Sequence, residues 1–259
     1  MDANTLRILS LDGGGARGYL SVSFLSKLQS FFDKPLWQIF DVIAGSSTGG
    51  LQALSYAYGK TIDEVKPFYL TEAPWVFTIR TTADVTVGSI NASLPSNRPN
   101  IAQKIAIIGD NGYLYRSTST ESNYGSARLK TVLTDNFGTK TLQDLKTNVL
   151  ITSFRKDSNS PIIFSNLNDP NYFGRNFSIV DVALATSAAP IYLPPQLIGT
   201  QNYIDGGVYQ NNPAQLALNM GRRIKPLAKK FCSDFSKSAR IKQKTGCVQT
   251  FPSFSLLEA

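Results

Sequence analysis

A serine at the centre of a glycine-rich turn is the residue best placed for chemistry in this sequence. Gly45 to Gly49 fit the pattern Gly-x-Ser-x-Gly with Ser47 at its centre. The apolar run Val42–Ala44 precedes this turn, and residues 51–58 are typical of a helix. A serine between a buried strand and a helix can act as a nucleophile, because the turn exposes its hydroxyl and the helix end stabilises a developing oxyanion. The alternative is a glycine- and serine-rich loop without chemistry.

A second glycine-rich stretch, Gly13–Gly18, lies between a strand-like and a helix-like segment. Its spacing fits the Gly-x-Gly-x-x-Gly pattern of dinucleotide-binding proteins, in which an acidic residue ends the second strand. Asp33 falls at the end of the first helix instead, and Asp41 begins the second strand, which ends in the Ser47 turn. The sequence therefore disfavours nucleotide binding, which stays an alternative.

A third informative stretch contains an aspartate. Tyr203-Ile204 predicts a short strand, with Asp205 at its C-terminal end and Gly206 and Gly207 directly after it. Open α/β sheets place their reactive groups at the C-terminal ends of strands, so Asp205 is a candidate for the chemistry. The alternative is an ordinary turn aspartate in front of two glycines.

The chain has 259 residues and no histidine. This length suits one large α/β domain, or two small ones, with a substantial core. A hydrophobic content of 42% and a charged content of 17% are typical of a globular protein. Without histidine, a Ser-His-Asp triad, a Cys-His pair and a histidine metal ligand are all excluded. If Ser47 is a nucleophile, a different kind of residue has to take its proton.

Two strand–turn–helix units at the start of the chain predict the architecture. Such units argue for a parallel sheet covered by helices. The fold class we expect is α/β, with a central, mostly parallel sheet sandwiched by helices. The elements that the apolar patterns predict are strands at 6–11, 42–44, 148–154, 161–165 and 203–204, and helices at 19–32, 51–58, 129–137 and 179–187.

Basic residues gather at the C-terminal end of the chain. Residues 221–259 contain nine basic and two acidic residues, whereas residues 1–220 contain 17 and 16. We expect residues 1–220 to form the folded domain and residues 221–259 to form a basic tail. The tail either contacts anionic lipid or is a disordered, solvated end. Nucleic acid is not expected as a partner, because the rest of the chain has no motif that reads bases.

Residues 83–127 are the least regular part of the sequence, with a run rich in Pro, Ser and Asn at 91–100. They predict either a lid or substrate-entry region or a solvated excursion without a catalytic role.

Location is predicted from what the sequence lacks. No run approaches the roughly 18 to 20 apolar residues of a membrane span, and residues 1–11 lack the pattern of a secretory signal peptide. We expect a soluble protein, either cytoplasmic or exported without a recognisable signal peptide. Cys232 and Cys247 allow one disulfide, but we expect free thiols because nothing else indicates an oxidising compartment.

Taken together, the sequence resembles the patatin-like phospholipase family over about residues 5–220. Three motifs carry the resemblance in the family's order: the glycine loop Asp12–Gly18, the serine turn Gly45–Gly49 and Asp205–Gly207. Segments at 137–152, 185–190 and 211–214 are also similar. The residues that support the motifs are Asp12, Arg17, Gly18, Gly45, Gly49, Gly206 and Gly207.

The resemblance implies a three-layer α/β/α fold and a Ser-Asp dyad in place of a triad. Matched by position, Ser47 is the nucleophile, Asp205 is the base, and the N–H groups of Gly13, Gly14 and Gly15 form the oxyanion hole. The implied activity is that of a phospholipase A-type lipid acyl hydrolase. Such an enzyme cleaves acyl esters of glycerophospholipids or related lipids through an acyl-enzyme, with no metal and no cofactor. The implied partner is a lipid substrate at a membrane surface, which the protein contacts transiently.

The end of the chain departs from the family. The family continues after the match to Asn212-Pro213-Ala214 with a helix and a further strand, and we expect no such strand after Met220. This departure motivates an alternative function, a catalytically impaired lipid-binding or storage protein on the same fold.

Within the glycine loop, Arg17 is expected to reinforce the positive potential around the oxyanion hole.

Overall fold

The structure, a computed structural model, describes residues 5–29, 31, 33–73 and 126–228, together with the backbone of two strands at 230–235 and 249–250. The predictions for residues 83–125, for most of the basic tail and for the two cysteine side chains fall outside the described residues.

Both faces of the first strand are buried. β1 (Thr5–Leu11) places Leu6 and Ile8 in one hydrophobic cluster and Leu9 and Leu11 in a second one. Successive side chains of a strand point to opposite faces, so the two clusters lie on the two faces of the sheet. Burial on both faces is typical of a parallel sheet that helices cover on each side.

The central strands run parallel, which confirms the predicted architecture. The strand order is β5-β6-β3-β2-β1-β7-β8, and β4 also pairs with β3. β1 pairs parallel with β2 and β7, and β2 pairs parallel with β3. β4 and β6 are antiparallel to β3, and β5 is antiparallel to β6. These strands are β2 (Val42–Ser46), β3 (Asn148–Arg155), β4 (Ser160–Phe164), β5 (Gln196–Ile198), β6 (Gln201–Asp205), β7 (Lys230–Phe235) and β8 (Gln249–Thr250).

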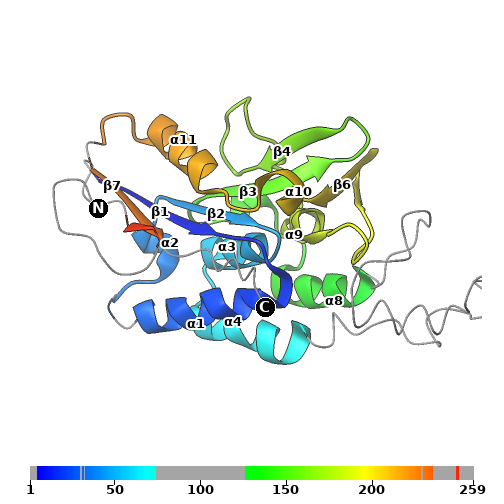
Figure 1. The fold of residues 1–259 in the computed structure, drawn as a ribbon, viewed down its shortest axis with the longest axis horizontal. Coiled ribbons are helices and arrows are strands. Elements are labelled where there is room, and N and C mark those ends of the chain that lie inside the picture. Colours follow the sequence, from blue (N-terminus) through cyan, green and yellow to red (C-terminus); the bar gives the residue numbers. More distant parts are fainter. Residues whose placement is uncertain are drawn as a thin grey trace, which may run out of the picture.

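Helices cover the sheet unequally. α1, α3, α4, α8 and α9 lie on one face, and α11 lies on the opposite face (Figure 1). Three layers, helix, sheet and helix, result. The helices are α1 (Gly18–Gln29), α2 (Leu36–Ile39), α3 (Thr48–Tyr58), α4 (Ile62–Pro67), α8 (Ser126–Phe137), α9 (Ile179–Ser187), α10 (Gly207–Gln210) and α11 (Ala214–Ile224), with the short turns η1 (Gly15–Arg17), η2 (Phe68–Glu72) and η3 (Leu142–Asp144).

Short-range interactions fix several helix ends. Thr61 begins α4 with a capping box, in which its hydroxyl accepts from the N–H of Glu64 and the Glu64 carboxylate accepts from the N–H of Thr61. The Ser178 hydroxyl accepts from the N–H of Val180 at the start of α9. Gly138, with φ of +54°, ends α8. Each signal acts within a few residues, so sequence suffices to find it.

One expectation about the C-terminal end is wrong. The chain does form a strand after Met220, because β7 (Lys230–Phe235) pairs parallel with β1, from Thr5 opposite Lys230 to Ile8 opposite Ser233. The strand mixes charged and apolar residues, so no period-two pattern reveals it, and its pairing is made by backbone groups at the edge of β1. The predicted boundary at residue 220 lies inside α11. The division into a folded domain and a basic tail stays a prediction.

Within the described ranges, no helix combines the length and the apolar character that crossing a membrane requires.

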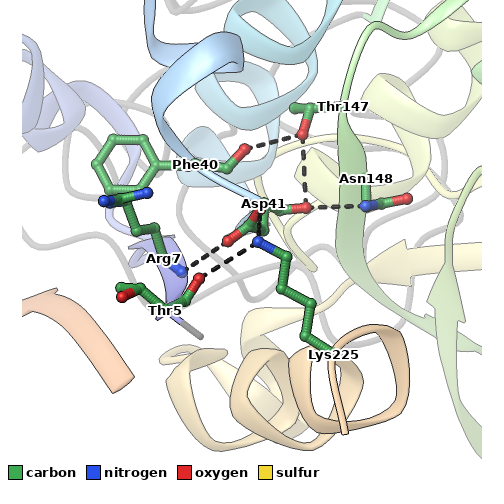
Figure 2. A network of polar contacts seen from close by, with 7 residues as sticks. All are labelled: Thr5, Arg7, Phe40, Asp41, Thr147, Asn148 and Lys225. Carbon is green, nitrogen blue, oxygen red and sulfur yellow. Dashed lines mark hydrogen bonds and ion pairs between the residues drawn. The ribbon is translucent and has the colours of Figure 1, made fainter. Parts of the chain in front are cut away.

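An ion pair ties the end of α11 to the start of β2. The Lys225 ammonium lies 2.7 Å from a carboxylate oxygen of Asp41 and donates to the Thr5 carbonyl at 3.3 Å. The second carboxylate oxygen of Asp41 accepts from the N–H of Arg7 at 2.8 Å. Figure 2 shows these contacts, together with the Asn148 side chain bonded to the Asp41 carbonyl. The network joins β1, β2, β3 and α11 at the end of β2 that is remote from Ser47.

We expect Lys225→Met to lower the free energy of unfolding by about 1–3 kcal/mol, between the values of exposed and buried pairs. The reason is that Asp41, with only 9% of its side chain exposed, would keep its charge without a cation beside it. Chemical denaturation measures the effect. The matched control is Lys140→Met, which removes an exposed pair with Asp144 and should change stability very little. Equal losses in the two variants would contradict a special role for the Lys225 pair.

Candidate active site

Ser47 forms the whole connection between β2 and α3. β2 ends at Ser46 and α3 begins at Thr48, and Ser47 between them has φ of 53° and ψ of −124°. A positive φ is uncommon and costly for a residue with a Cβ atom. This sharp strand-to-helix turn is the geometry of a nucleophile elbow, as the spacing of the glycines predicts.

The elbow depends on close packing of β1 against the first turn of α3. A Cβ atom at Gly49 would overlap the carbonyl of Leu11 and lie 2.7 Å from the Asp12 carbonyl oxygen. Only glycine permits this approach. The approach matters because it brings the end of β1, and with it the glycine loop, beside Ser47.

The glycine loop after β1 lies against Ser47 and is held by Asn211. A Cβ atom built on Gly13 would lie 3.2 Å from the Cβ of Ser47. The N–H of Gly13 donates to the Asn211 carbonyl at 3.1 Å, and the Asn211 side chain donates to the Gly13 carbonyl at 3.3 Å. The Gly13 N–H is therefore engaged. The N–H groups of Gly14 and Gly15 have no acceptor among the described residues.

Asp205 reaches the same place from an antiparallel strand. In β3, Thr152 pairs with Ser46 of β2, and the next residue, Ser153, pairs with Asp205 of β6. Ser47 and Asp205 therefore flank β3 at the same level of the sheet. β6 runs antiparallel to β3, so the rule for the C-terminal ends of parallel strands does not account for the position of Asp205. The register of β6 against β3 does.

The Asp205 carboxyl is held in an environment that favours its protonated form. Burial raises the pKa of Asp205 to about 6, while hydrogen bonds from the Ser47 side chain and the Gly207 N–H oppose this rise. The Gly207 N–H donates to Asp205 Oδ1 at 2.6 Å. Asp205 is thus a carboxyl that titrates near pH 6 and whose pKa responds to the Ser47 side chain, and a group with such a pKa can act as a general base near neutral pH.

Asp12 is a second carboxyl with an altered pKa near the glycine loop. Burial raises the pKa of Asp12 to about 6, and a hydrogen bond from Asn212 partly opposes the rise. The Asn212 side chain donates to Asp12 at 3.3 Å and accepts from the N–H of Ala214 at 3.0 Å. Asn212 thereby bonds the first N–H of α11, which begins after Pro213, and Asp12 ties the end of β1 to this contact.

The other predicted residues support the loop and the turns. The Arg17 guanidinium is exposed, and its Nε donates to the Gly14 carbonyl at 3.4 Å. Gly18 and Gly206 pack so closely against neighbouring elements that a Cβ atom would collide with side chains or backbone, those of Thr48 and Thr152 among them. Among the described residues, no three His, Cys, Asp or Glu side chains gather as a metal site would require.

Two residues at the site carry no role in the sequence-based predictions. Asn211 bonds both backbone groups of Gly13, and the Thr186 hydroxyl accepts from the N–H of Ser47 at 3.0 Å. Both lie in segments that resemble the family, and this resemblance was the only signal that pointed to them. Their contacts join residues 139 or more positions apart, so no local pattern predicts them.

Comparison with known proteins places this chain in a family. The family model described as patatin-like phospholipase matches residues 9–218, so the chain belongs to that family. It is 32% identical over 238 residues to patatin-like protein 2 of Arabidopsis thaliana, with 83% of this chain and 52% of that protein covered. It is 30% identical over 227 residues to a cGAMP-activated phospholipase of Vibrio cholerae, with 83% of this chain and 58% of that protein covered. The chain thus spans about half the length of these relatives.

A solved structure shares the fold. The crystal structure of VipD from Legionella pneumophila superposes with a TM-score of 0.50 at 15% identity, covering 91% of this chain and 51% of that one. At this identity the likeness concerns the fold alone.

Proposed function

We propose that this protein is a lipid acyl hydrolase of the phospholipase A type, which cleaves acyl esters of glycerophospholipids or related lipids through a Ser47–Asp205 dyad. The observation that carries the proposal is the pairing of a serine on a strained elbow with a buried aspartate whose pKa is raised to about 6. Membership of the patatin-like phospholipase family supports the substrate class.

In the proposed reaction, Asp205 accepts the proton of the Ser47 hydroxyl as Oγ attacks the carbonyl carbon of the ester. The N–H groups of Gly14 and Gly15 stabilise the oxyanion, an effect worth about 3 kcal/mol for each donor in comparable sites. The bond to the leaving alcohol breaks, and Asp205 returns the proton to that alcohol. An acyl-enzyme on Ser47 remains. Asp205 then takes a proton from water as the water oxygen attacks the acyl carbonyl carbon. The ester bond to Ser47 breaks as Asp205 returns that proton to Oγ, which releases the fatty acid and restores both residues.

The proposed oxyanion hole contains two N–H groups, one fewer than the resemblance implies. Three glycines were expected to contribute N–H groups, but the Gly13 N–H donates to the Asn211 carbonyl at 3.1 Å. We therefore assign the oxyanion to Gly14 and Gly15 and assign Gly13 a role in holding the loop. Arg17 is exposed at the loop and adds positive potential from its outer side.

The experiment that tests this function is product analysis of the purified full chain with phosphatidylcholine and phosphatidylglycerol vesicles. We expect free fatty acid and lysophospholipid in equal amounts. The alternative, a lipid-binding or storage protein on the same fold, predicts vesicle binding without products and no turnover of a short-chain ester such as 4-nitrophenyl butyrate. Absence of turnover on every ester and phospholipid would reject the hydrolase.

We also propose that the basic C-terminal end attracts the protein to anionic membranes. Replacing Lys237, Arg240, Lys242 and Lys244 together by Gln is expected to weaken co-sedimentation with phosphatidylserine vesicles at least about tenfold, since each basic residue near such a surface contributes roughly 1 kcal/mol. Deletion of residues 221–259 is unsuitable as a test, because it removes β7 from the edge of β1.

The control for this test replaces an equal number of exposed basic residues elsewhere, which are Lys34, Lys140, Lys156 and Arg175. Both variants lose the same net charge. If the two variants lose vesicle binding equally, the attraction is a property of the net charge and the proposal for the C-terminal end is wrong.

A further inference from the structure

One fully buried hydroxyl contacts the backbone of the proposed nucleophile. Thr186, near the end of α9, is 0% exposed. Its Oγ1 accepts from the N–H of Ser47 at 3.0 Å and donates to the Thr152 carbonyl at 2.6 Å. The hydroxyl thus uses both its acceptor and its donor capacity, and it anchors the Ser47 peptide to the neighbouring strand β3.

The same turn of chain also holds the strand that carries the proposed base. The Thr186 carbonyl accepts from the N–H of Gly206 at 3.3 Å, and the Ala188 carbonyl accepts from the N–H of Asp205 at 3.0 Å. The end of α9 therefore bonds the backbone of Ser47 on one side and of Asp205 on the other.

Tight packing leaves Thr186 little freedom. A Cβ atom at Gly50, in the first turn of α3, would lie 2.8 Å from the Thr186 methyl group and 2.9 Å from its hydroxyl. The Thr186 hydroxyl bonds the N–H of Ser47, the residue whose φ of 53° is unfavourable. Strained backbone conformations persist only where the surrounding structure holds them.

We propose that Thr186 is a positioning residue for the hydrolase. Its hydroxyl fixes the peptide group in front of Ser47, so that the Ser47 Oγ stays within reach of Asp205. This inference rests on the proposed function. It adds a residue that touches neither the substrate nor the reacting atoms and that acts through the backbone of the nucleophile.

The test compares Thr186→Val with Thr186→Ser in hydrolysis of 4-nitrophenyl butyrate. Valine keeps the shape but leaves the Ser47 N–H and the Thr152 carbonyl without this partner. We expect Thr186→Val to lower kcat about 10- to 100-fold with KM nearly unchanged, since small misplacements of a reacting group have effects of this size. Thr186→Ser keeps the hydroxyl and should retain kcat within about threefold. Equal losses in the two variants would show that the hydroxyl is not the cause.

A matched control is available one strand away. Thr152 is also 0% exposed, and its own hydroxyl has no partner among the described residues. Thr152→Val makes the same chemical change at the same depth and keeps the backbone carbonyl that Thr186 uses. We expect kcat to stay within about threefold of the wild type. A loss as large as that of Thr186→Val would overturn the proposal.

Two further measurements keep the outcome decisive. If Thr186→Val does not fold, Thr186→Ala and Thr186→Ser are compared at a permissive temperature. The serine variant must then be at least about tenfold faster, because only it restores the hydroxyl.

If the wild type lacks esterase activity, the proposed function fails, whereas the Thr186 hydroxyl is still tested by hydrogen exchange of the Ser47 amide. That amide should be protected in the wild type and exposed to exchange in Thr186→Ala. Equal exchange in both overturns the inference.

Discussion

Ser47→Ala is expected to abolish the release of fatty acid from phospholipid vesicles, lowering kcat by at least about ten-thousand-fold. Without Oγ no acyl-enzyme forms, and what remains is the small stabilisation that the N–H groups of Gly14 and Gly15 give to attack by water. The fold should persist, because the elbow is held by backbone contacts such as that of the Ser47 N–H to Thr186. Mass spectrometry of released fatty acid, with circular dichroism of both proteins, measures the two quantities.

Ser46→Ala is the matched control for the nucleophile. Ser46 is fully buried at the end of β2, and its hydroxyl has no partner among the described residues. The same substitution one residue earlier should therefore leave kcat within about threefold of the wild type. Fatty-acid release that survives in Ser47→Ala would remove Ser47 from the mechanism, and equal losses in the two variants would point to a structural effect of the turn.

Asp205→Asn is expected to lower kcat by about a hundred- to ten-thousand-fold, the range of general-base catalysis. The amide can still accept from the Gly207 N–H, which lies 2.6 Å from Asp205 Oδ1, but it cannot take a proton from Ser47. In the wild type, the pKa of Asp205 near 6 predicts that kcat/KM rises with pH and reaches half its maximum near pH 6, because only the ionised carboxylate is a base. A wild-type rate that does not change between pH 5 and pH 8 would contradict this assignment.

The same substitution is expected to stabilise the protein above pH 6. The pKa of Asp205 is raised from 3.8 to about 6 on folding, so the folded state favours the protonated carboxyl. This contribution to stability is fully present below pH 3.8 and is lost as the pH rises through 6. At pH 8 the ionised carboxylate therefore costs up to about 3 kcal/mol, which Asp205→Asn removes. The gain in melting temperature should be large at pH 8 and should shrink toward pH 4.

Asp181→Asn is the control for the effect of Asp205→Asn on turnover. Asp181 lies on α9, burial raises its pKa as well, and it accepts a hydrogen bond from Gln196 at 3.0 Å. Its replacement should leave turnover unchanged, because it lies outside the proposed machinery. If Asp181→Asn reduces kcat as strongly as Asp205→Asn does, loss of a buried carboxylate in general, and not loss of the base, is responsible.

Sequence alone determined the parts of this protein that depend on neighbouring residues. The apolar runs predict β1, β2 and β3, because each strand is buried on both faces. The caps at Thr61 and Ser178 are equally local, since a cap involves side chains and N–H groups two or three residues apart. The glycine spacing around Ser47 likewise predicts the elbow, because its strained turn is made within five residues.

Tertiary structure alone decided how distant segments meet. The N–H of Gly13 is engaged by Asn211, the hydroxyl of Thr186 holds the peptide of Ser47, and burial raises the pKa of Asp205. β7 was missed for the same reason, since its place is set by the free edge of β1 and not by its own pattern. Hydrogen bonding and desolvation at these positions depend on groups that are far apart in the chain, so they exist only once the sheet and its helices have packed together.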